Sequence, residues 1–478
     1  MRVVIAPDSF KECASAAAVA KALSVGWRRV FADAEIVCVP MADGGEGTAD
    51  ALIAATGGTE IAAQVTDPLG KPIVAKYGFL GDGATAVIEM AAASGLPLVP
   101  PEERDPRVTT TYGTGELLRD ALNRGAKRII LGIGGSATND GGAGMAQALG
   151  FSLLDGEGRE LPRGGAALAR LERIDSSKKH ARLEECRILA ACDVTNPLCG
   201  PQGASLVYGP QKGATEAVAL QLDAALDHYG RVLERQLGVS VIELPGAGAA
   251  GGLGAGLVAF AGAQLRPGVE LVAEACGLAG RMEGADLVIT GEGRLDGQTA
   301  HGKTPAGVAR IAKRQGIPVI AVAGALGAGY EELYEHGIDS VFSICQGPIG
   351  LPEAIERVEE LLASAAESIA RLWKAAGTGS VAADTAESPF EDSVFVVPPL
   401  GGCSAERAPA KAGTTNIQGG RGDVWILSKG TVIRREHPPY PPSKGDLPVS
   451  VSGLTLIQGR CMKCIERRLE KRIRSHML

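Results

Sequence analysis

The sequence predicts an α/β protein built on a parallel β-sheet, and two stretches of regular alternation carry that prediction. Residues 2–55 alternate short Val- and Ile-rich segments with Ala-rich segments of helical character. Residues 286–373 repeat the alternation of strand and helix three times. Strands that alternate with helices are typical of a parallel sheet with right-handed crossovers. These two stretches therefore place the protein in the α/β class.

The expected elements follow one another along the chain. The first part predicts strands at 2–6 and 35–41 and helices at 15–30 and 48–55, and the last part predicts strands at 287–290, 318–323 and 339–344 and helices at 306–314, 330–336 and 352–373. Between them, residues 59–89 alternate in character around two turns, which predicts a hairpin-like β region. Strands at 129–133 and 187–191 and a long amphipathic helix at 215–237 are also expected.

Length and charge exclude several classes of protein. The 478 residues leave room for two or three domains. A net charge of −7 and a pI near 5.6 disfavour nonspecific binding to nucleic acid, which needs a basic face. The longest uncharged run, 244–265, holds a proline and seven glycines, so we do not expect a membrane helix. The N-terminus lacks the pattern of a signal peptide, and the ten scattered cysteines suit reduced thiols, so we expect a cytoplasmic protein.

The C-terminal segment differs in composition from the rest. Residues from 378 onward hold nine of the 27 prolines and show little strand or helix period. Such a segment cannot bury enough apolar surface to fold, so we expect residues 377–478 to form a disordered tail. Cys461 and Cys464 form a single CxxC pair, which lacks a second ligand pair for zinc.

The stretch 127–150 is the first candidate for a binding site. A short apolar strand leads into a glycine-rich loop, and an apolar helix begins near Gly142. Glycines leave room for an anion at the main chain, and the following helix adds a partial positive charge. The open positions and side-chain donors are Gly134, Gly135, Ser136, Thr138 and Asn139. We expect phosphate to bind there, although a plain connection between strand and helix explains the same residues equally well.

Aspartates follow several of the expected strands. Asp8, Asp43 and Asp193 each come directly after an apolar segment. In open α/β sheets the ligand crevice lies at the carboxyl ends of the strands, so these residues are expected to meet at one rim. The alternative is that each aspartate caps the next helix.

Residues 297–304 carry the glycine, lysine and threonine spacing of a phosphate-binding P-loop. Lys303 and Thr304 take the places of the phosphate lysine and the magnesium hydroxyl. Six residues separate the expected strand from the first glycine, so we retain the phosphate chemistry and not the P-loop fold. His301 is either a donor to the substrate or an ordinary loop histidine, and Lys212 is either a phosphate ligand or a solvated surface lysine.

Gly246, Gly248 and Gly251 match the dinucleotide-binding fingerprint after a strand-like segment at 239–244. An NAD(P)-dependent dehydrogenase is therefore a competing interpretation. Pro245 interrupts the junction and no clean βαβ unit surrounds the match, which makes this interpretation the weaker one. A noncatalytic protein that binds a phosphorylated metabolite is a third.

Seven motifs, taken together, resemble the glycerate kinase family, type 1. They are IAPDSFK at 5–11, MADGGEGT at 41–48, TTTYGTG at 109–115, GGSATNDGG at 134–142, CDVTNP at 192–197, GPQKG at 209–213 and TGEGRLD at 290–296. The resemblance implies phosphorylation of D-glycerate by ATP, at the 2-hydroxyl. It also implies a discontinuous Rossmann-like parallel-sheet domain at 1–65 and 285–376 that carries an inserted α/β domain at 66–284. The tail has no counterpart in the family.

Phosphoryl transfer needs a phosphate cradle, Mg²⁺ on acidic oxygens, cations near the transferred group and a group that accepts the hydroxyl proton. The expected partners are ATP, Mg²⁺ and the small-molecule substrate. The carboxylates at the expected strand ends are Asp8, Asp43, Asp193 and Asp296. We expect Asp8 and Asp43 to bind the metal and Asp193 to be the base, with Asp296 as a further catalytic carboxylate. Besides the cradle residues already named, we expect Lys11, Lys212 and Lys303 to be the cations, Arg294 to bind the glycerate carboxylate, and Ser9 and His301 to line the site.

Overall fold

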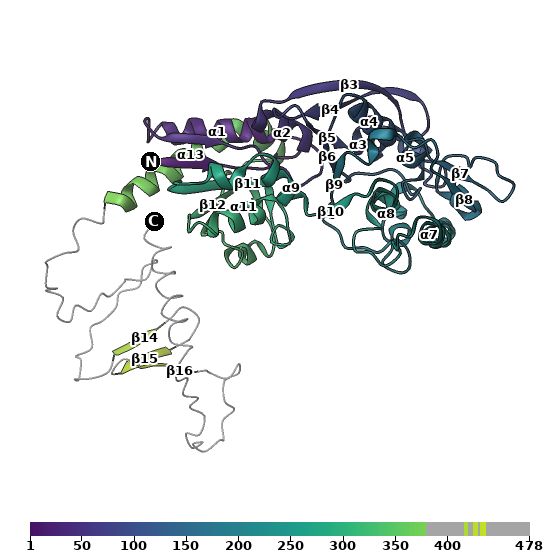
Figure 1. The fold of residues 1–478 in the computed structure, drawn as a ribbon. Helices are drawn as coiled ribbons and strands as arrows, with labels where there is room; N and C mark the ends of the chain where they lie inside the picture. The colour runs from purple at the N-terminus through teal and green to yellow at the C-terminus, as the bar shows by residue number, and fades with distance from the viewer. Residues whose placement is uncertain (379–414, 419–423, 429–430, 436–478) are drawn as a thin grey trace, which may run out of the picture. The chain divides into compact units, whose positions relative to one another are not determined.

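The first sheet joins strands from distant parts of the chain (Figure 1). The computed structural model describes residues 1–378 and the short segments 415–418, 424–428 and 431–435. Five parallel strands lie in the order β13-β12-β11-β1-β2. Their bounds are Arg2–Ile5 (β1), Glu35–Cys38 (β2), Leu287–Leu295 (β11), Val319–Leu326 (β12) and Ser340–Ser343 (β13). This is a doubly wound order, and its direction reverses between β1 and β11, where such sheets bind ligands.

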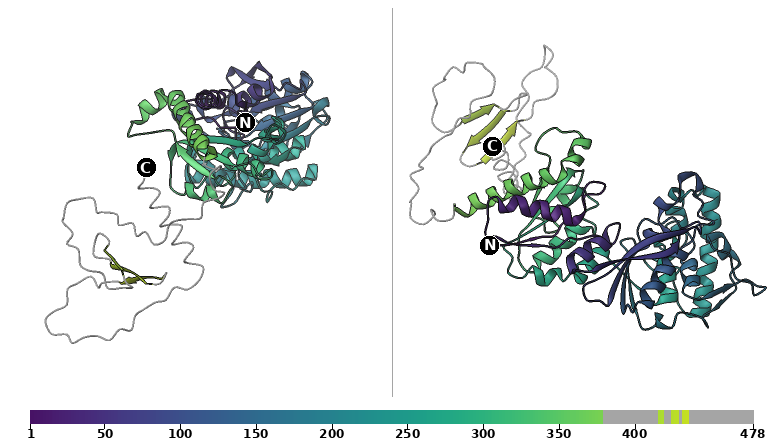
Figure 2. Two further views of the ribbon diagram at one scale, coloured as in Figure 1. Left: turned by 90° about the vertical axis from the view of Figure 1, so that its left-hand side faces the viewer. Right: turned by 90° about the horizontal axis from the view of Figure 1, so that it is seen from above.

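Helices cover both faces of this sheet because its residues alternate between two apolar clusters. Val3 and Ile5 pack with helices α1 and α13, while Val4 and Ala6 pack with α9 and α11. The bounds of these helices are Ala16–Arg28 (α1), Val358–Thr378 (α13), Gly268–Ala275 (α9) and Thr304–Lys313 (α11). Helices α1 and α13 lie side by side (Figure 2), so close that a Cβ on Gly26 would lie 1.9 Å from the Ala363 carbonyl oxygen.

The second sheet has six strands in the order β10-β9-β6-β5-β4-β3. Their bounds are Thr59–Thr66 (β3), Pro72–Phe79 (β4), Thr85–Glu89 (β5), Arg128–Gly132 (β6), Arg187–Ala191 (β9) and Gln264–Arg266 (β10). The pairs β3–β4 and β4–β5 are antiparallel, as the alternating pattern predicted, and the other pairs are parallel. Strand β3, at Thr59–Thr66, thus pairs within this sheet, just before the expected boundary at residue 66.

The remaining elements surround the second sheet or connect the two sheets, except α12, which packs beside α13 on the first sheet. They are α2 (Thr48–Thr56), α3 (Ala91–Ser94), α4 (Tyr112–Asn123), α5 (Ala143–Ala148), α6 (Ala204–Tyr208), α7 (Glu216–Leu237), α8 (Ala249–Ala261), α10 (Leu278–Arg281), α12 (Leu351–Glu356) and the small hairpin β7 (Ser152–Leu154) and β8 (Arg173–Asp175). No helix in the described residues is long and apolar enough to cross a membrane.

A shared apolar cluster connects the two sheets. Val87, Ile130 and Leu189, one from each of three neighbouring strands of the second sheet, belong to the same cluster as Val4 of β1 and Val269 of α9. Their sequence neighbours face the opposite side of the second sheet. The two sheets therefore form the expected fold, a discontinuous parallel-sheet domain that carries an inserted α/β domain.

Three local features differ from the expectations. Residues 239–244 form no strand, and β11 continues five residues beyond its expected end at Thr290. The segment expected as a helix at 330–336 is a short 3-10 turn at Tyr330–Tyr334. Within the tail that we expected to be disordered, the structure describes an antiparallel sheet in the order β14-β15-β16, at Thr415–Gln418, Val424–Ser428 and Thr431–Arg435. Cys461 and Cys464 lie outside the described residues.

Candidate functional site

Asp8 lies at the reversal point of the first sheet, directly after β1. Its residue is 8% exposed, and its carboxylate accepts hydrogen bonds from the Ser9 N–H at 2.6 Å and the Thr304 hydroxyl at 2.5 Å. Burial and, to a smaller extent, the nearby carboxylate of Asp43 raise the pKa of Asp8 to about 6, although the two hydrogen-bond donors oppose the shift. This carboxylate is therefore costly to ionise unless a cation is bound.

Glu292 is a site residue that the sequence analysis did not identify. It lies in the extension of β11, beside β1, and accepts a hydrogen bond of 2.6 Å from the Thr299 hydroxyl. Burial raises its pKa to about 7; Lys303 lowers it, and Asp8 and Asp43 raise it. A glutamate between two glycines at the end of an apolar strand was the available signal. We had assigned that segment to a loop.

Asp193 contributes an acid from the second sheet. It follows β9, and one of its oxygens accepts a hydrogen bond of 2.9 Å from the Gly268 N–H at the start of α9. Burial, with smaller contributions from the charges of Asp43 and Glu270, raises the pKa of Asp193 to about 6, although the hydrogen bond from Gly268 opposes the shift. The negative charge of Asp43 thus contributes to the raised pKa values of Asp8, Glu292 and Asp193, which come from both sheets. We call these four residues the carboxylate cluster.

Cations and hydroxyls border the carboxylate cluster. Lys303 immediately precedes α11 and is close enough to Glu292 to lower the pKa of that residue. Because β11 runs to Leu295, only Asp296 separates the strand from Gly297, so our spacing argument against a P-loop arrangement was wrong. Lys11 is exposed, and its backbone nitrogen would lie 3.7 Å from a Cβ on Gly293. Lys11 therefore lies at the same end of β11.

The glycine-rich loop is divided between the site and the interior. Gly134 lies close to the loop that carries Asp43, since a Cβ on Gly134 would lie 3.6 Å from the Gly45 Cα. Ser136 is buried beside residues 94–96. Thr138 and Asn139 are fully buried, and the Asn139 amide donates to the Ser205 hydroxyl at 2.9 Å. Only the first part of this loop can reach a ligand at the carboxylate cluster.

The helix start that we expected to bind phosphate already binds an internal anion. The Asp140 carboxylate accepts hydrogen bonds from the backbone N–H groups of Gly142 and Gly144, both at 3.2 Å. It also accepts from the backbone and hydroxyl of Thr111. Helix α5 has only six residues. Asp140 therefore holds the loop together, and its carboxylate occupies the helix start where we expected phosphate.

Lys212 has neither of the two roles considered for it. The residue is 2% exposed, and its ammonium group donates to the Thr138 carbonyl at 2.7 Å. Burial lowers the pKa of Lys212 to about 7, and Asp140 opposes this shift. It is neither solvated nor placed to meet a phosphate. Its position ties residues 210–212 to the inner half of the glycine-rich loop.

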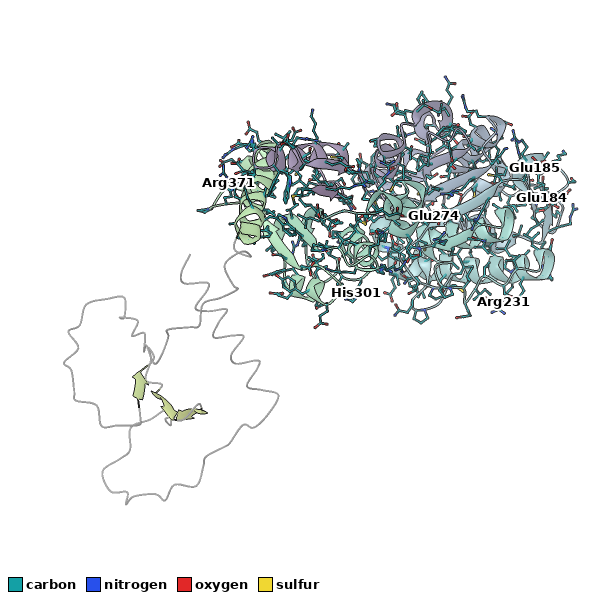
Figure 3. All side chains as sticks on the ribbon, turned by 60° about the vertical axis from the view of Figure 1, so that its left-hand side comes forward. Glu184, Glu185, Arg231, Glu274, His301 and Arg371 are labelled. Atoms are coloured by element: carbon teal, nitrogen blue, oxygen red, sulfur yellow. The ribbon has the colours of Figure 1, made fainter. Side chains whose placement is uncertain are left out.

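Arg294, Asp296 and His301 lie near the surface. Arg294 and Asp296 form an ion pair at 3.3 Å in which the arginine side chain is mostly exposed. His301 is exposed (Figure 3), and its ring lies 6.4 Å from that of His336. Within residues 1–378, no hydrogen bond or ion pair joins these three residues to the carboxylate cluster.

The dinucleotide fingerprint has no space for a nucleotide. A Cβ on Gly251 would lie 1.9 Å from the Thr138 carbonyl oxygen, and the Gly251 carbonyl accepts a hydrogen bond of 3.0 Å from the Gly141 N–H. Its glycines thus allow α8 to pack against the glycine-rich loop. Without the preceding strand and without an open backbone, the dehydrogenase interpretation loses its basis.

Comparison with known sequences identifies the family. The sequence profile described as "Glycerate kinase family" matches residues 3–374. The chain belongs to this family. It is 54% identical over 368 residues to a glycerate kinase from Halalkalibacterium halodurans, covering 77% of this chain and 97% of that protein. It is 54% identical over 370 residues to the glycerate 2-kinase of Escherichia coli K12, with the same two coverages.

A solved structure agrees with this glycerate kinase family assignment. The crystal structure of a candidate glycerate kinase 2 from Salmonella typhimurium LT2 matches with a TM-score of 0.74 and 52% sequence identity. The match covers 79% of this chain and 99% of that one. The likeness therefore extends over the whole two-sheet body.

A kinase uses ATP as a substrate, and the carboxylate cluster offers oxygen ligands of the kind that Mg²⁺ prefers. Within the described residues, no three His, Cys, Asp or Glu side chains form a ready-made metal site. Mg²⁺ usually keeps several waters and binds one or two carboxylates together with substrate phosphates. The hydrogen-bonded pair of Asp8 and Thr304, with Asp43 nearby, fits that smaller requirement.

Proposed function

We propose that this chain is an ATP-dependent glycerate kinase that transfers the γ-phosphoryl group to the 2-hydroxyl of D-glycerate. Family membership supports the reaction, and the name of the E. coli relative, a glycerate 2-kinase, supports the 2-hydroxyl. The observation that carries the site assignment is the field of Asp43, which acts on carboxylates from both sheets. Such a group of acids is stable only near cations, as a metal-nucleotide complex supplies.

The phosphates of ATP are assigned to the loop at 297–304. Lys303 supplies a cation, and the start of α11, which no side chain caps, lies at Asp8 through the Thr304 hydroxyl. Thr304 and Asp8 would hold Mg²⁺, and Asp43 would complete the charge balance. In P-loop enzymes, a hydroxyl next to the lysine and an aspartate from a neighbouring strand share the metal in this manner. When bound, the metal would neutralise charge on the phosphate oxygens.

Asp193 is assigned as the group that accepts the hydroxyl proton. One of its oxygens is held by Gly268, which leaves the other for the substrate. With a pKa of about 6 the carboxylate is mostly ionised at pH 7 and still basic enough to take a proton. Glu292, with a pKa of about 7, is the competing base.

We assign glycerate to the end of β11, where Lys11 also lies. Arg294 and Lys11 are assigned to its carboxylate, and Asp296 would orient Arg294 through their ion pair. Ser9 and Ser136, with Gly134 and Gly135, would provide donors at the rim. His301 stays a prediction as a substrate contact from the surface of the loop.

A coupled assay tests the reaction. The full chain with ATP, Mg²⁺ and D-glycerate should release ADP, and phosphorus NMR of the product should show the coupling pattern of a 2-phosphate. Reduction of NAD⁺ by D-glycerate without ATP would support the dehydrogenase instead. Saturable binding of phosphorylated acids with no turnover would support the noncatalytic protein.

A further inference from the structure

Three elements meet at Gly44 without space for a side chain. A Cβ on Gly44 would lie 2.4 Å from the Ala191 Cβ at the end of β9, and Gly44 has a φ of +92°. A Cβ on Gly132, at the end of β6, would lie 2.4 Å from the Gly44 carbonyl oxygen. A Cβ on Gly268, at the start of α9, would lie 1.8 Å from the Asp43 carbonyl oxygen. The backbone that carries Asp43 is thus enclosed by parts of the chain far away in sequence.

Gly268 makes two contacts with the carboxylate cluster. Its N–H donates to the Asp193 carboxylate at 2.9 Å, and its missing side chain admits the Asp43 carbonyl. One residue therefore sets the positions of an acid from each sheet. We propose that Gly268 is a positioning residue of the enzyme, which holds Asp43 and Asp193 at the separation that phosphoryl transfer needs. This inference rests on the proposed function, since it assigns its effect to that reaction.

Helix formation does not explain a glycine at this position. Gly268 is the first residue of α9, and its φ is not among the positive values of the described chain. Alanine is preferred to glycine in helices, so the requirements of α9 alone favour a side chain here. The backbone of Asp43, which occupies the place of that side chain, gives the physical reason for glycine.

The test is a double-mutant cycle in the full chain with Gly268→Ala and Asp43→Asn. Misplacing a reacting group by about 1 Å can cost about a hundredfold in rate, so we expect Gly268→Ala to lower kcat at least about tenfold. Because Gly268 acts through both Asp43 and Asp193, Gly268→Ala should lower the residual kcat of the Asp43→Asn variant by a clearly smaller factor than it lowers that of the unchanged chain, since coupled sites are non-additive. A general structural role would give the same loss in both backgrounds.

Gly280→Ala is the matched control. Gly280 lies in α10, a Cβ there would meet nothing within 4 Å, and its φ is not positive. This variant should keep the kcat of the unchanged chain. Circular dichroism and thermal melting would verify that Gly268→Ala folds. If it does not, Gly132→Ala presses on the neighbouring Gly44 carbonyl from β6 and replaces it in the cycle.

The outcomes separate this inference from the proposed function. Turnover of glycerate by the unchanged chain tests the function. Equal losses from Gly268→Ala in both backgrounds, an unchanged kcat, or failure of both glycine variants to fold would overturn the positioning role and leave the function in place. A chain that does not turn over glycerate would instead remove the proposed function itself.

Discussion

The hydroxyl of Thr304 donates a hydrogen bond of 2.5 Å to the carboxylate of Asp8, a residue 296 positions earlier in the chain. This contact joins the start of α11 to the end of β1, at the place where the strand order of the first sheet reverses. A hydroxyl and a carboxylate held together offer two oxygen ligands of the kind that Mg²⁺ prefers. The assignment of the metal depends on this pair.

Replacing Thr304 by valine removes the hydroxyl and keeps the shape of the side chain. We expect the Mg²⁺ concentration that gives half-maximal ADP release to rise about tenfold, since one oxygen ligand is lost. Titration of activity with Mg²⁺ at saturating ATP measures this. Thr59→Val, on an exposed position of β3, is the control and should leave the Mg²⁺ dependence unchanged. An unchanged titration for Thr304→Val would exclude the hydroxyl as a ligand.

Asp8→Asn should change how stability depends on pH. The folded-state pKa of Asp8 is about 6 against 3.8 for the free side chain, so between pH 4 and 6 the folded protein binds the proton more tightly than the unfolded chain. The unchanged protein therefore loses stability as pH rises through this window, by roughly 2 to 3 kcal/mol. Asparagine does not ionise, so the variant lacks this pH-dependent loss of stability. Without Mg²⁺, the Tm of Asp8→Asn minus that of the unchanged protein should increase from pH 4 to pH 7. A constant difference would contradict the burial of this charge.

Asp193→Asn tests the proton acceptor. The asparagine oxygen can still accept the hydrogen bond from the Gly268 N–H, so the fold should be kept while kcat falls by about 10²- to 10⁴-fold. Glu292→Gln is the comparison, because it removes the competing base and keeps the acceptor for the Thr299 hydroxyl. Steady-state kinetics of both variants decide between them. Turnover that survives in Asp193→Asn and is lost in Glu292→Gln would transfer the role to Glu292.

Lys212→Met should abolish the increase in stability that the unchanged protein shows as the pH becomes alkaline. The folded-state pKa of Lys212 is about 7 against 10.5 for the free side chain, so between these values the unfolded chain binds more protons. The unchanged protein therefore becomes more stable as pH rises from about 7 to about 10, and the methionine variant should lack this increase. Thermal melting across that range measures it, with the exposed Lys127→Met as control. Parallel curves for Lys212→Met and the unchanged protein would show that Lys212 is not buried.

The sequence predicted the parts of the site that follow from sheet geometry. Asp8, Asp43 and Asp193 each follow a strand, and the carboxyl ends of parallel strands meet at one edge. The structure brings these three residues into one electrostatic cluster. Glu292 was missed because Gly291 and Gly293 interrupt the apolar pattern, although both lie within β11. Strand length is set here by pairing with β12, which a local pattern cannot show.

Burial of charged loop residues could not be predicted from the local sequence. Lys212 lies in a glycine-containing loop, where a lysine is usually solvated. Its burial depends on the inner half of the glycine-rich loop, which packs against Gly251 of α8. The burial of Asp140 has the same cause. The N–H groups that donate to its carboxylate lie at the start of a helix that distant segments enclose. Tertiary packing, rather than residue type, decided which polar groups face the ligand.

The central position of β11 in the first sheet constrains the order in which the protein can assemble during synthesis. The Thr290 hydroxyl bonds to the carbonyl of Ala6, 284 residues earlier, and β1 pairs with β11 along its length. All strands of the second sheet lie between Thr59 and Arg266. On the ribosome, the inserted sheet has its complete set of strands while β1, already paired with β2, still lacks β11 on its other side. The first sheet, which carries Asp8, can therefore be completed only after the second sheet, which carries Asp193, has been synthesised.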